Sequence, residues 1–121
     1  MREAQHPDRT RRPSLRPRIR QTRPGQCGCP YHCHSSQWEL FLFHSGTATV
    51  RTPAGTQVFG PGYIVLHPPG EAHQLTSTGG EDLLYSLVAD NPLTDIWHYP
   101  DSNKRGHSTT RDFLRMNAAD Y

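Results

Sequence analysis

Three histidines and one glutamate form the pattern in this chain with the most evident chemical potential. His32 and His34 are separated by one residue, Glu39 follows inside an apolar run, and His73 comes after a Pro-Pro-Gly turn. On an extended strand, residues two apart point to the same face, so the two nearby imidazoles can reach one ion. Three imidazoles and one carboxylate are a mixed nitrogen and oxygen donor set, which suits a divalent transition metal.

Glu39 supports the metal interpretation over the alternative that these are ordinary strand histidines. It lies within the run QWELFLF, where a buried carboxylate without a partner would be costly. Glu39 has an odd residue number and the two nearby histidines have even ones, so on one continuous strand it would point to the opposite face. Residues 35–37 must therefore interrupt the strand. Glu39 can then return on the next strand and face the same interior.

Glycines and prolines complete two spaced motifs around these four residues. The motifs are His32-x-His34-x4-Glu39-x6-Gly46 and Gly62-x5-Pro68-x-Gly70-x2-His73. Together they resemble the two motifs of the cupin superfamily, whose members are small double-stranded β-helix barrels. The resemblance implies that four residues are metal ligands, namely His32, His34, Glu39 and His73. It also implies that Gly46, Gly62 and Gly70 are turn glycines.

The resemblance has two departures. The second motif of the family often ends with Asn four residues after its histidine, and this chain has Ser77 there. The family also has strands before the first motif, whereas residues 1–24 do not read as strands. The barrel would therefore lack an edge strand, take one from a partner, or have lost its true N-terminus.

The elements that must position these residues read as short strands. Apolar or β-branched runs occupy residues 37–43, 47–52, 56–59, 63–67, 73–78 and 83–89, with Gly and Pro turns between them. This spacing predicts an all-β jelly-roll barrel in a single domain. We expect a disordered Arg- and Pro-rich arm at 1–24, the barrel core at 25–90, and a polar tail at 91–121, with one or two helical turns within 109–116.

Composition excludes several classes of protein. Only 33% of the 121 residues are hydrophobic, and no stretch approaches the ~20 apolar residues that cross a bilayer. Eleven prolines and ten glycines argue against a helical bundle. Eight arginines against Glu3 and Asp8 make residues 1–24 carry +6, while residues 25–121 carry −4 from five basic and nine acidic residues. The arm has no aromatic residue to stack on bases, which argues against nucleic acid as a partner.

The cysteines and the remaining histidines carry weaker signals. Cys27 and Cys29 could form a separate zinc site with Cys33 and His6 or His44, but C-x-C without a second matched pair favours reduced thiols in a loop. Cys33 should face away from the ligands. His67 precedes Pro68 and is the candidate general base, with a solvated histidine at the barrel rim as the alternative.

These observations predict a metal-binding cupin that holds Fe, Mn, Ni or Zn. It would be a metal-dependent enzyme of dioxygenase, isomerase or lyase type, acting on a small polar organic acid or sugar derivative. The alternatives are a non-catalytic binding or sensor module, in which the metal anchors a ligand, and a purely structural metal. An apolar face left by so small a barrel predicts a homodimer. The absence of a secretory leader pattern and the odd number of cysteines predict a cytoplasmic location.

Overall fold

A computed structural model describes residues 15–107 and 113–115. Within these ranges the chain forms strands and turns, which confirms the predicted all-β class. In chain order the strands are β1 (Arg16–Thr22), β2 (Cys33–His34), β3 (Glu39–Ser45), β4 (Ala48–Thr52), β5 (Gly55–Phe59), β6 (Ile64–His67), β7 (Gln74–Ser77), β8 (Leu83–Ala89), β9 (Ile96–Tyr99), β10 (Lys104–His107) and β11 (Phe113–Arg115).

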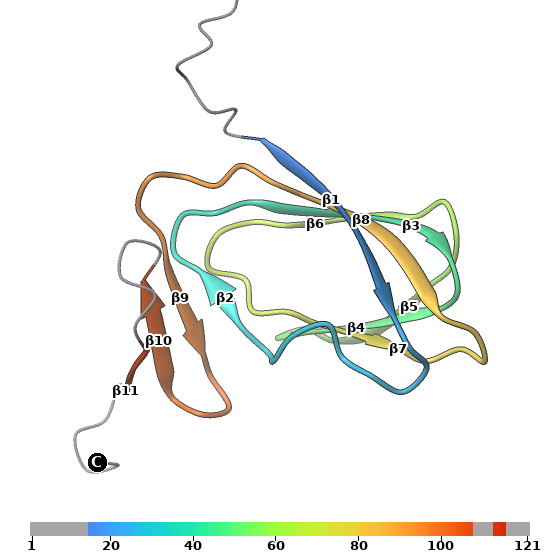
Figure 1. The fold of residues 1–121 in the computed structure, drawn as a ribbon. Helices are drawn as coiled ribbons and strands as arrows, with labels where there is room; N and C mark the ends of the chain where they lie inside the picture. Colours follow the sequence, from blue (N-terminus) through green and yellow to red (C-terminus); the bar gives the residue numbers. More distant parts are fainter. Residues whose placement is uncertain (1–14, 108–112, 116–121) are drawn as a thin grey trace, which may run out of the picture.

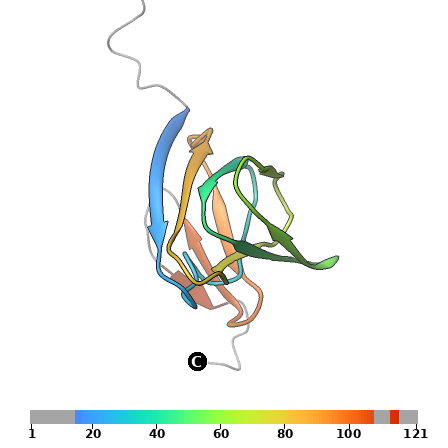
Figure 2. The ribbon, with the colours of Figure 1, turned by 90° about the vertical axis from the view of Figure 1, so that its right-hand side faces the viewer.

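The strands are arranged in three antiparallel sheets (Figure 1). The first has the order β1-β8-β3-β6, the second β5-β4-β7, and the third β11-β10-β9-β2. The first two sheets enclose the core. Figure 2 shows the same molecule turned by 90° about the vertical axis. Strands β3 and β8 of the first sheet and β4 and β7 of the second supply the buried cluster. Its members are Phe41, Phe43, Ala48, Val50, Leu75, Leu83 and Tyr85.

Alternation along the strands explains why these segments form a barrel wall. In β3, Glu39, Phe41 and Phe43 are buried, while the residues between them are partly exposed. In β8, Leu83 and Tyr85 are buried on the same face. A period of two places one set of side chains on the interior and the other on the outer surface. The metal-ligand candidate Glu39 therefore belongs to the interior set.

Every apolar or β-branched run predicted as a strand contains one. Residues 37–43, 47–52, 56–59, 63–67, 73–78 and 83–89 correspond to β3, β4, β5, β6, β7 and β8, with ends displaced by at most two residues. Residues 35–38 lie outside the strands, so the predicted interruption before Glu39 is confirmed. The polar terminal segments differ from expectation.

The expectation of a disordered arm over residues 1–24 is wrong for residues 16–22. These residues form β1, which pairs with β8 from Arg16↔Ala89 to Thr22↔Leu83. β1 is the edge of its sheet, where Pro17 is tolerated because an edge strand has one side without a pairing partner. Arginines occupy the inward parity of β1, where the other strands carry apolar residues, which explains why a search for apolar interior positions did not identify it. Residues 1–14 lie outside the described part of the chain.

The expectation of a polar tail over residues 91–121 is also wrong in part. β9 pairs with both β2 and β10, and β10 pairs with β11, so this segment closes the third sheet beside the histidines. The predicted helical turns fall on residues 109–116, of which 113–115 are a strand and the others lie outside the described residues. No helix in the described part of the chain is long and apolar enough to cross a membrane.

Candidate metal centre

The four predicted ligand residues meet at one carboxylate oxygen. The Oε1 atom of Glu39 lies 2.6 Å from Nε2 of His34, 3.3 Å from Nε2 of His73 and 3.5 Å from Nε2 of His32. The donor atoms of His32, Glu39 and His73 all lie within 4.8 Å of one another. The four side chains are at most 12% exposed. The structure therefore brings together all four residues that the two motifs singled out.

Backbone pairing explains how residues so distant in sequence meet. His32 and His73 form an isolated antiparallel bridge, in which His32 N donates to His73 O at 3.2 Å and His73 N donates to His32 O at 2.8 Å. His34 lies two residues further on in β2, and Glu39 is the first residue of β3. The short irregular segment between them allows β3 to enter the first sheet with Glu39 facing inward.

The three imidazoles are oriented by partners on their other ring nitrogen. Nδ1 of His32 donates to the carbonyl of Pro30 at 2.8 Å, and Nδ1 of His73 donates to the carbonyl of Glu71 at 3.1 Å. Because Nδ1 carries the proton that a carbonyl accepts, Nε2 is the nitrogen of each ring that a metal would take, with its lone pair available once any proton on Nε2 is released.

His34 is oriented by a carboxylate. Its Nδ1 lies 2.6 Å from Oδ2 of Asp95, a buried residue of the segment before β9. The other oxygen of Asp95 accepts hydrogen bonds from the backbone N–H groups of Ser36 at 3.0 Å and Gln37 at 3.3 Å. Asp95 therefore joins the ligand loop to the third sheet. A carboxylate in this position also makes the imidazole a stronger donor.

Mutual contacts strongly perturb the protonation of the cluster. Burial alone raises the pKa of Glu39, but its contacts with the three imidazoles outweigh burial and lower that pKa well below 4.5. Burial lowers the pKa of His32, yet its contacts with Cys29 and Glu39 outweigh burial and raise the pKa to about 10. Burial likewise lowers the pKa of His34, and its contacts with Glu39 and Asp95 produce a net rise.

Oε1 of Glu39 and Nε2 of His73 are buried and lie 3.3 Å apart, close enough for an ion-pair contact, but neither atom makes a hydrogen bond of good geometry. Buried polar atoms almost always form a hydrogen bond or bind an ion, so two such atoms without one at the same point indicate a binding site. A cation at this point would satisfy both atoms at once. Three nitrogen donors and one oxygen donor fit a divalent transition metal, and the residues present are compatible with one.

His67 is buried rather than solvated at the rim. It is 1% exposed, and its ring stacks on the ring of His73 at 3.9 Å between centroids. Its Nδ1 lies 3.0 Å from Oε1 of Glu71, and its Nε2 has no hydrogen-bond partner. Burial first, and then the neighbouring His73, lower the pKa of His67. A neutral imidazole with a free Nε2 can accept a proton.

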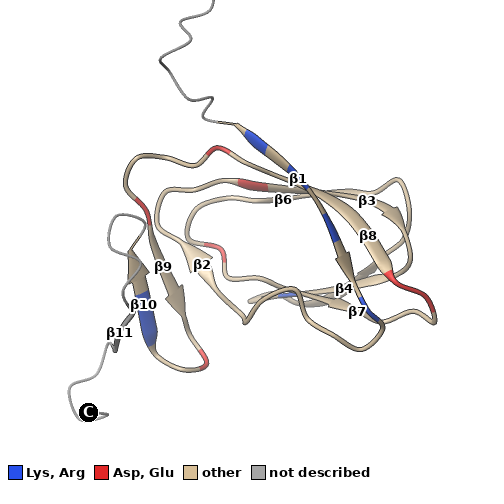
Figure 3. Cartoon of the chain, in the orientation of Figure 1, with Lys and Arg blue, Asp and Glu red and all other residues tan. Residues whose placement is uncertain are grey.

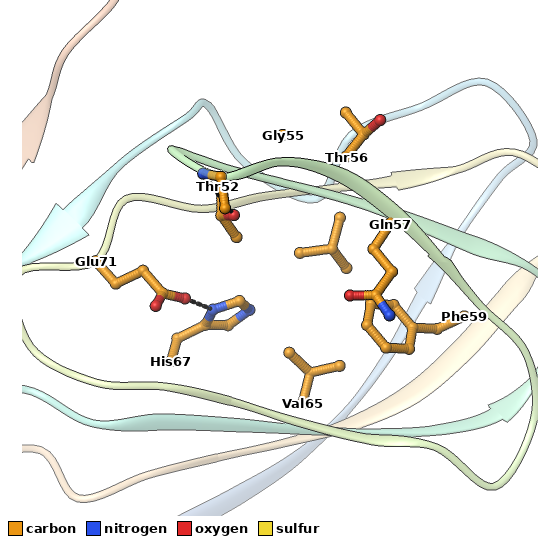
Figure 4. A pocket seen from close by; sticks show the side chains of 10 residues that line it. Thr52, Gly55, Thr56, Gln57, Phe59, Val65, His67 and Glu71 are labelled. Carbon is orange, nitrogen blue, oxygen red and sulfur yellow. Dashed lines mark hydrogen bonds and ion pairs between the residues drawn. The ribbon is translucent and has the colours of Figure 1, made fainter.

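Pockets of different size lie beside the cluster, and two of them bear on its chemistry. The smaller, of about 260 Å³, lies between β4, β5 and β6, and His67 forms part of its wall across from Gln57 and Phe59 (Figure 4). The larger, of about 670 Å³, is lined by His32, His34, Asp95 and Tyr99. Since two ligand candidates line the larger pocket, a small molecule there can approach the centre directly.

The cysteines do not form a second cluster in the described part of the chain. Its one group of three or more close donors is the cluster that contains Glu39. Cys29 is instead a neighbour of a ligand candidate, with Sγ 3.4 Å from Nδ1 of His32. Cys33 is not among the converging donors. His6, the remaining member of the alternative zinc site, lies outside the described residues.

Sequence reasoning missed several residues around the centre. Asp95 had no local signal, because its partner His34 lies in a distant segment. Glu71 was also overlooked, although its partner His67 is only four residues away. Arg16 and Arg18 line the larger pocket, and their alternation along the sequence RPRIR could have indicated a strand with one cationic face.

Comparison with known proteins agrees with this architecture. The family model described as Cupin domain matches residues 19–89, which is more than half of the chain. No curated protein sequence matches the chain. The match begins within β1 and ends at the last residue of β8, so it covers all four residues of the cluster.

Solved structures share the same barrel at low sequence identity. A protein from Acidithiobacillus ferrooxidans, provisionally named a sugar phosphate isomerase, is 24% identical with a TM-score of 0.78, and the alignment covers 88% of this chain and 69% of that one. A sugar phosphate isomerase from Silicibacter pomeroyi is 18% identical with a TM-score of 0.80, covering 86% and 69%. A Cupin 2 conserved barrel protein from Salinispora arenicola is 20% identical with a TM-score of 0.56, covering 69% of each chain.

Proposed function

The chain belongs to the cupin domain family, and on that premise we propose that it binds one divalent transition metal through His32, His34, Glu39 and His73. The observation that carries the proposal is the convergence of three Nε2 atoms on one carboxylate oxygen. The partners on the three Nδ1 atoms add to it, because they leave each Nε2 available to a metal. The metal is Fe, Mn, Ni or Zn, all of which accept imidazole and carboxylate donors.

We propose that the metal serves an enzyme acting on a small polar organic acid or sugar derivative. A metal bound here would polarise a carbonyl or hydroxyl oxygen of the substrate. His67 supplies a buried imidazole with a free Nε2 facing the smaller pocket, and Glu71 holds its Nδ1 (Figure 4). A substrate that extends from the metal into the smaller pocket would meet His67, which could then move a proton between adjacent substrate atoms, as isomerisation requires. Two barrels that cover most of this chain are named sugar phosphate isomerases, which favours isomerisation over dioxygenase or lyase chemistry.

Metal analysis of purified protein tests the metal proposal. We expect about one equivalent of metal per chain in the native protein. We expect most of it to be lost in His34→Ala, which removes one of the donors. His44→Ala is the matched control, because His44 is exposed and bonds only the Ser86 hydroxyl at 2.6 Å. Full metal content in His34→Ala would contradict the assignment.

A turnover screen separates the enzyme from the binding module. Protein loaded in turn with Fe(II), Mn(II), Ni(II) or Zn(II) is incubated with sugar phosphates and small hydroxy acids, with and without oxygen. Turnover abolished by His67→Gln with the metal retained supports the enzyme proposal. Ligand-induced changes in the metal spectrum without turnover under any condition would support the sensor or binding module instead.

We further propose that the protein forms a homodimer through the outer face of the first sheet. Two rows of side chains cross all four strands on that face, Pro17–Val88–Leu40–Leu66 and Ile19–Ser86–Leu42–Ile64. Ile19, Ile64 and Leu66 are 74%, 59% and 51% exposed. An apolar face of this kind on a small domain favours self-association about a two-fold axis.

A further inference from the structure

Strand β1 presents arginines to the interior side of the first sheet. Directly opposite residues of an antiparallel pair share a face, and Arg16 is opposite Ala89 while Arg18 is opposite Leu87. Ala89 is buried and Leu87 packs against the core, so that face is the inner one. Thr22, on the same parity of β1, is also buried. The two arginines are exposed to solvent, and on this face they line the larger pocket.

The register places Arg16 in the same row as the candidate metal ligand. Ala89 is opposite Arg16 on one side and opposite Glu39 on the other, so the three residues form one line across β1, β8 and β3. Two strand spacings separate the Cα atoms of Arg16 and Glu39 by about 10 Å. An extended arginine side chain covers much of that distance. A small molecule can therefore touch the guanidinium and the centre at the same time.

The larger pocket joins these groups. Arg16 and Arg18 line the same cavity of about 670 Å³ as His32 and His34. In the described part of the chain, no carboxylate lies within ion-pair distance of either arginine. Among the described residues that line the pocket, the one carboxylate is Asp95, which is engaged by His34 and by backbone N–H groups. Figure 3 shows the basic positions following one another along β1.

We propose that Arg16 and Arg18 form a subsite for an oxyanion group, a carboxylate or a phosphate, of the ligand whose other end reaches the metal centre. The proposal rests on the proposed function and narrows its substrate class to anionic molecules. A guanidinium binds either group through two parallel N–H···O bonds, and two of them neutralise a dianion. Without such a ligand, two like charges stand together on one strand with no described counter-charge.

Anion binding to the full-length, metal-loaded protein tests the subsite. Inorganic phosphate and malonate are titrated separately by calorimetry into the wild type, Arg16→Gln/Arg18→Gln and Arg20→Gln. The last is the matched control, because Arg20 shares the strand and the face but does not line the pocket. We expect at least one anion to bind the wild type at millimolar or lower concentration. We expect the double variant to bind it at least tenfold more weakly, and the control within about twofold of the wild type.

The two anions distinguish the two chemical groups. Tighter binding of inorganic phosphate indicates a phosphorylated substrate, and tighter binding of malonate indicates a carboxylic acid. Equal binding by the wild type and the double variant, or an equal loss in Arg20→Gln, would overturn the subsite. Arg16→Lys keeps the charge but loses the paired N–H groups, so partial recovery of affinity in that variant supports recognition by the planar group.

Metal content measured on the same samples separates this inference from the proposed function. One equivalent of metal in all variants, with anion binding unchanged by the double substitution, overturns the subsite and leaves the metal proposal standing. A wild type that binds no metal overturns the metal proposal, and the same comparison of anion affinities still decides the subsite. Thermal unfolding of each variant verifies that the loss of binding does not come from loss of the fold.

Discussion

Glu39 is the residue on which the candidate centre depends. It is 5% exposed and stands in line with Phe41 and Phe43 on an interior strand face. Removing a carboxylate from water is costly unless charged or hydrogen-bonding partners compensate it. Three imidazole nitrogens surround its Oε1 and supply that compensation. The same three nitrogens hold the carboxylate in the ionised form that a metal requires.

Asp95 offers a test of how the protein orients a ligand candidate. We expect Asp95→Asn to lower metal affinity by roughly 10- to 100-fold while retaining the fold, because His34 loses the carboxylate that fixes its ring. Competition with a chromogenic chelator measures the affinity. Asp90→Asn is the control, because Asp90 also accepts a backbone hydrogen bond in this loop, from Trp38 at 3.0 Å, and Asp90 is not among the converging donors. Equal losses in both variants would show that the effect is one of loop stability.

The protonation of His32 predicts that metal binding releases a proton. In the metal-free protein the pKa of His32 is raised from 6.5 to about 10, so the ring is protonated at neutral pH. Binding of a metal needs the lone pair of Nε2, so affinity rises with pH between about 6.5 and 10. Calorimetry in buffers of different ionisation enthalpy at pH near 7.5 should detect at least one proton released per metal, because the pKa of His34 is raised as well. Buffer-independent heats would contradict the raised pKa.

The same pKa shifts make the stability of the metal-free protein fall at alkaline pH, where metal affinity rises. The raised pKa of His32 contributes stability that is fully present below 6.5 and is lost as the pH rises through about 10. The lowered pKa of Glu39 contributes stability that is present above 4.5 and is lost as the pH falls through its lowered value. Stability of the metal-free form due to these groups is therefore greatest between the two ordinary values. Thermal unfolding against pH, in the presence of a chelator, measures it.

At the scale of elements, the two faces of β1 differ, and each carries one of the proposals made above. Its inner residues Arg16 and Arg18 line the larger pocket, and its outer residues Pro17 and Ile19 extend the apolar face of the sheet. A strand at a sheet edge has one free side, so it can contribute both faces without interrupting the core. Changes in β1 are therefore expected to affect ligand binding and self-association separately, according to sequence parity.

The hairpin between β3 and β4 depends on a glycine that the motif identified. Gly46 has a φ of +86°, and a Cβ there would lie 2.5 Å from the backbone oxygen of Asp82. We expect Gly46→Ala to destabilise the protein by about 3 kcal/mol, because it combines an unfavourable backbone conformation with a clash against backbone. Urea unfolding measures the change. Gly60→Ala is the control, because Gly60 has no atom within 4 Å of its added Cβ, and a change below about 1 kcal/mol is expected there. Similar effects at the two positions would contradict this account.

At the scale of the molecule, the first sheet has a polar candidate site on its inner side and a largely apolar surface on its outer side. The histidine cluster and the two pockets lie on the inner side of the first sheet, and the two apolar rows lie on its opposite side. A dimer formed through the outer face would leave both pockets open to solvent. Ligand binding and self-association can thus occur together.

Light scattering tests that arrangement. We expect a dimer for the wild type at about 10 µM and a monomer for Leu66→Glu, because a buried glutamate without a partner opposes association. Val58→Glu is the control, since Val58 is 65% exposed but lies on β5, in the other barrel sheet. A wild type that remains monomeric at 100 µM, or dissociation caused equally by both substitutions, would contradict the proposed interface.

The amino-acid sequence alone determined the central strands and the identity of the four clustered residues. Alternating apolar residues between Gly and Pro turns set β3 to β8, because burial of one face requires a period of two. Only the tertiary structure decided the roles of β1, β9 and Asp95. β1 is rich in arginine, Asp95 is a single carboxylate, and β9 is a short run of four residues between turns, so none of them follows the apolar alternation of the central strands. Their places depend on partners supplied by distant strands. Pairing with β8 turned Arg16 toward the pocket, and pairing of β9 with β2 brought Asp95 to His34. Hydrophobic periodicity is encoded locally, whereas cross-strand register exists only after the chain has folded.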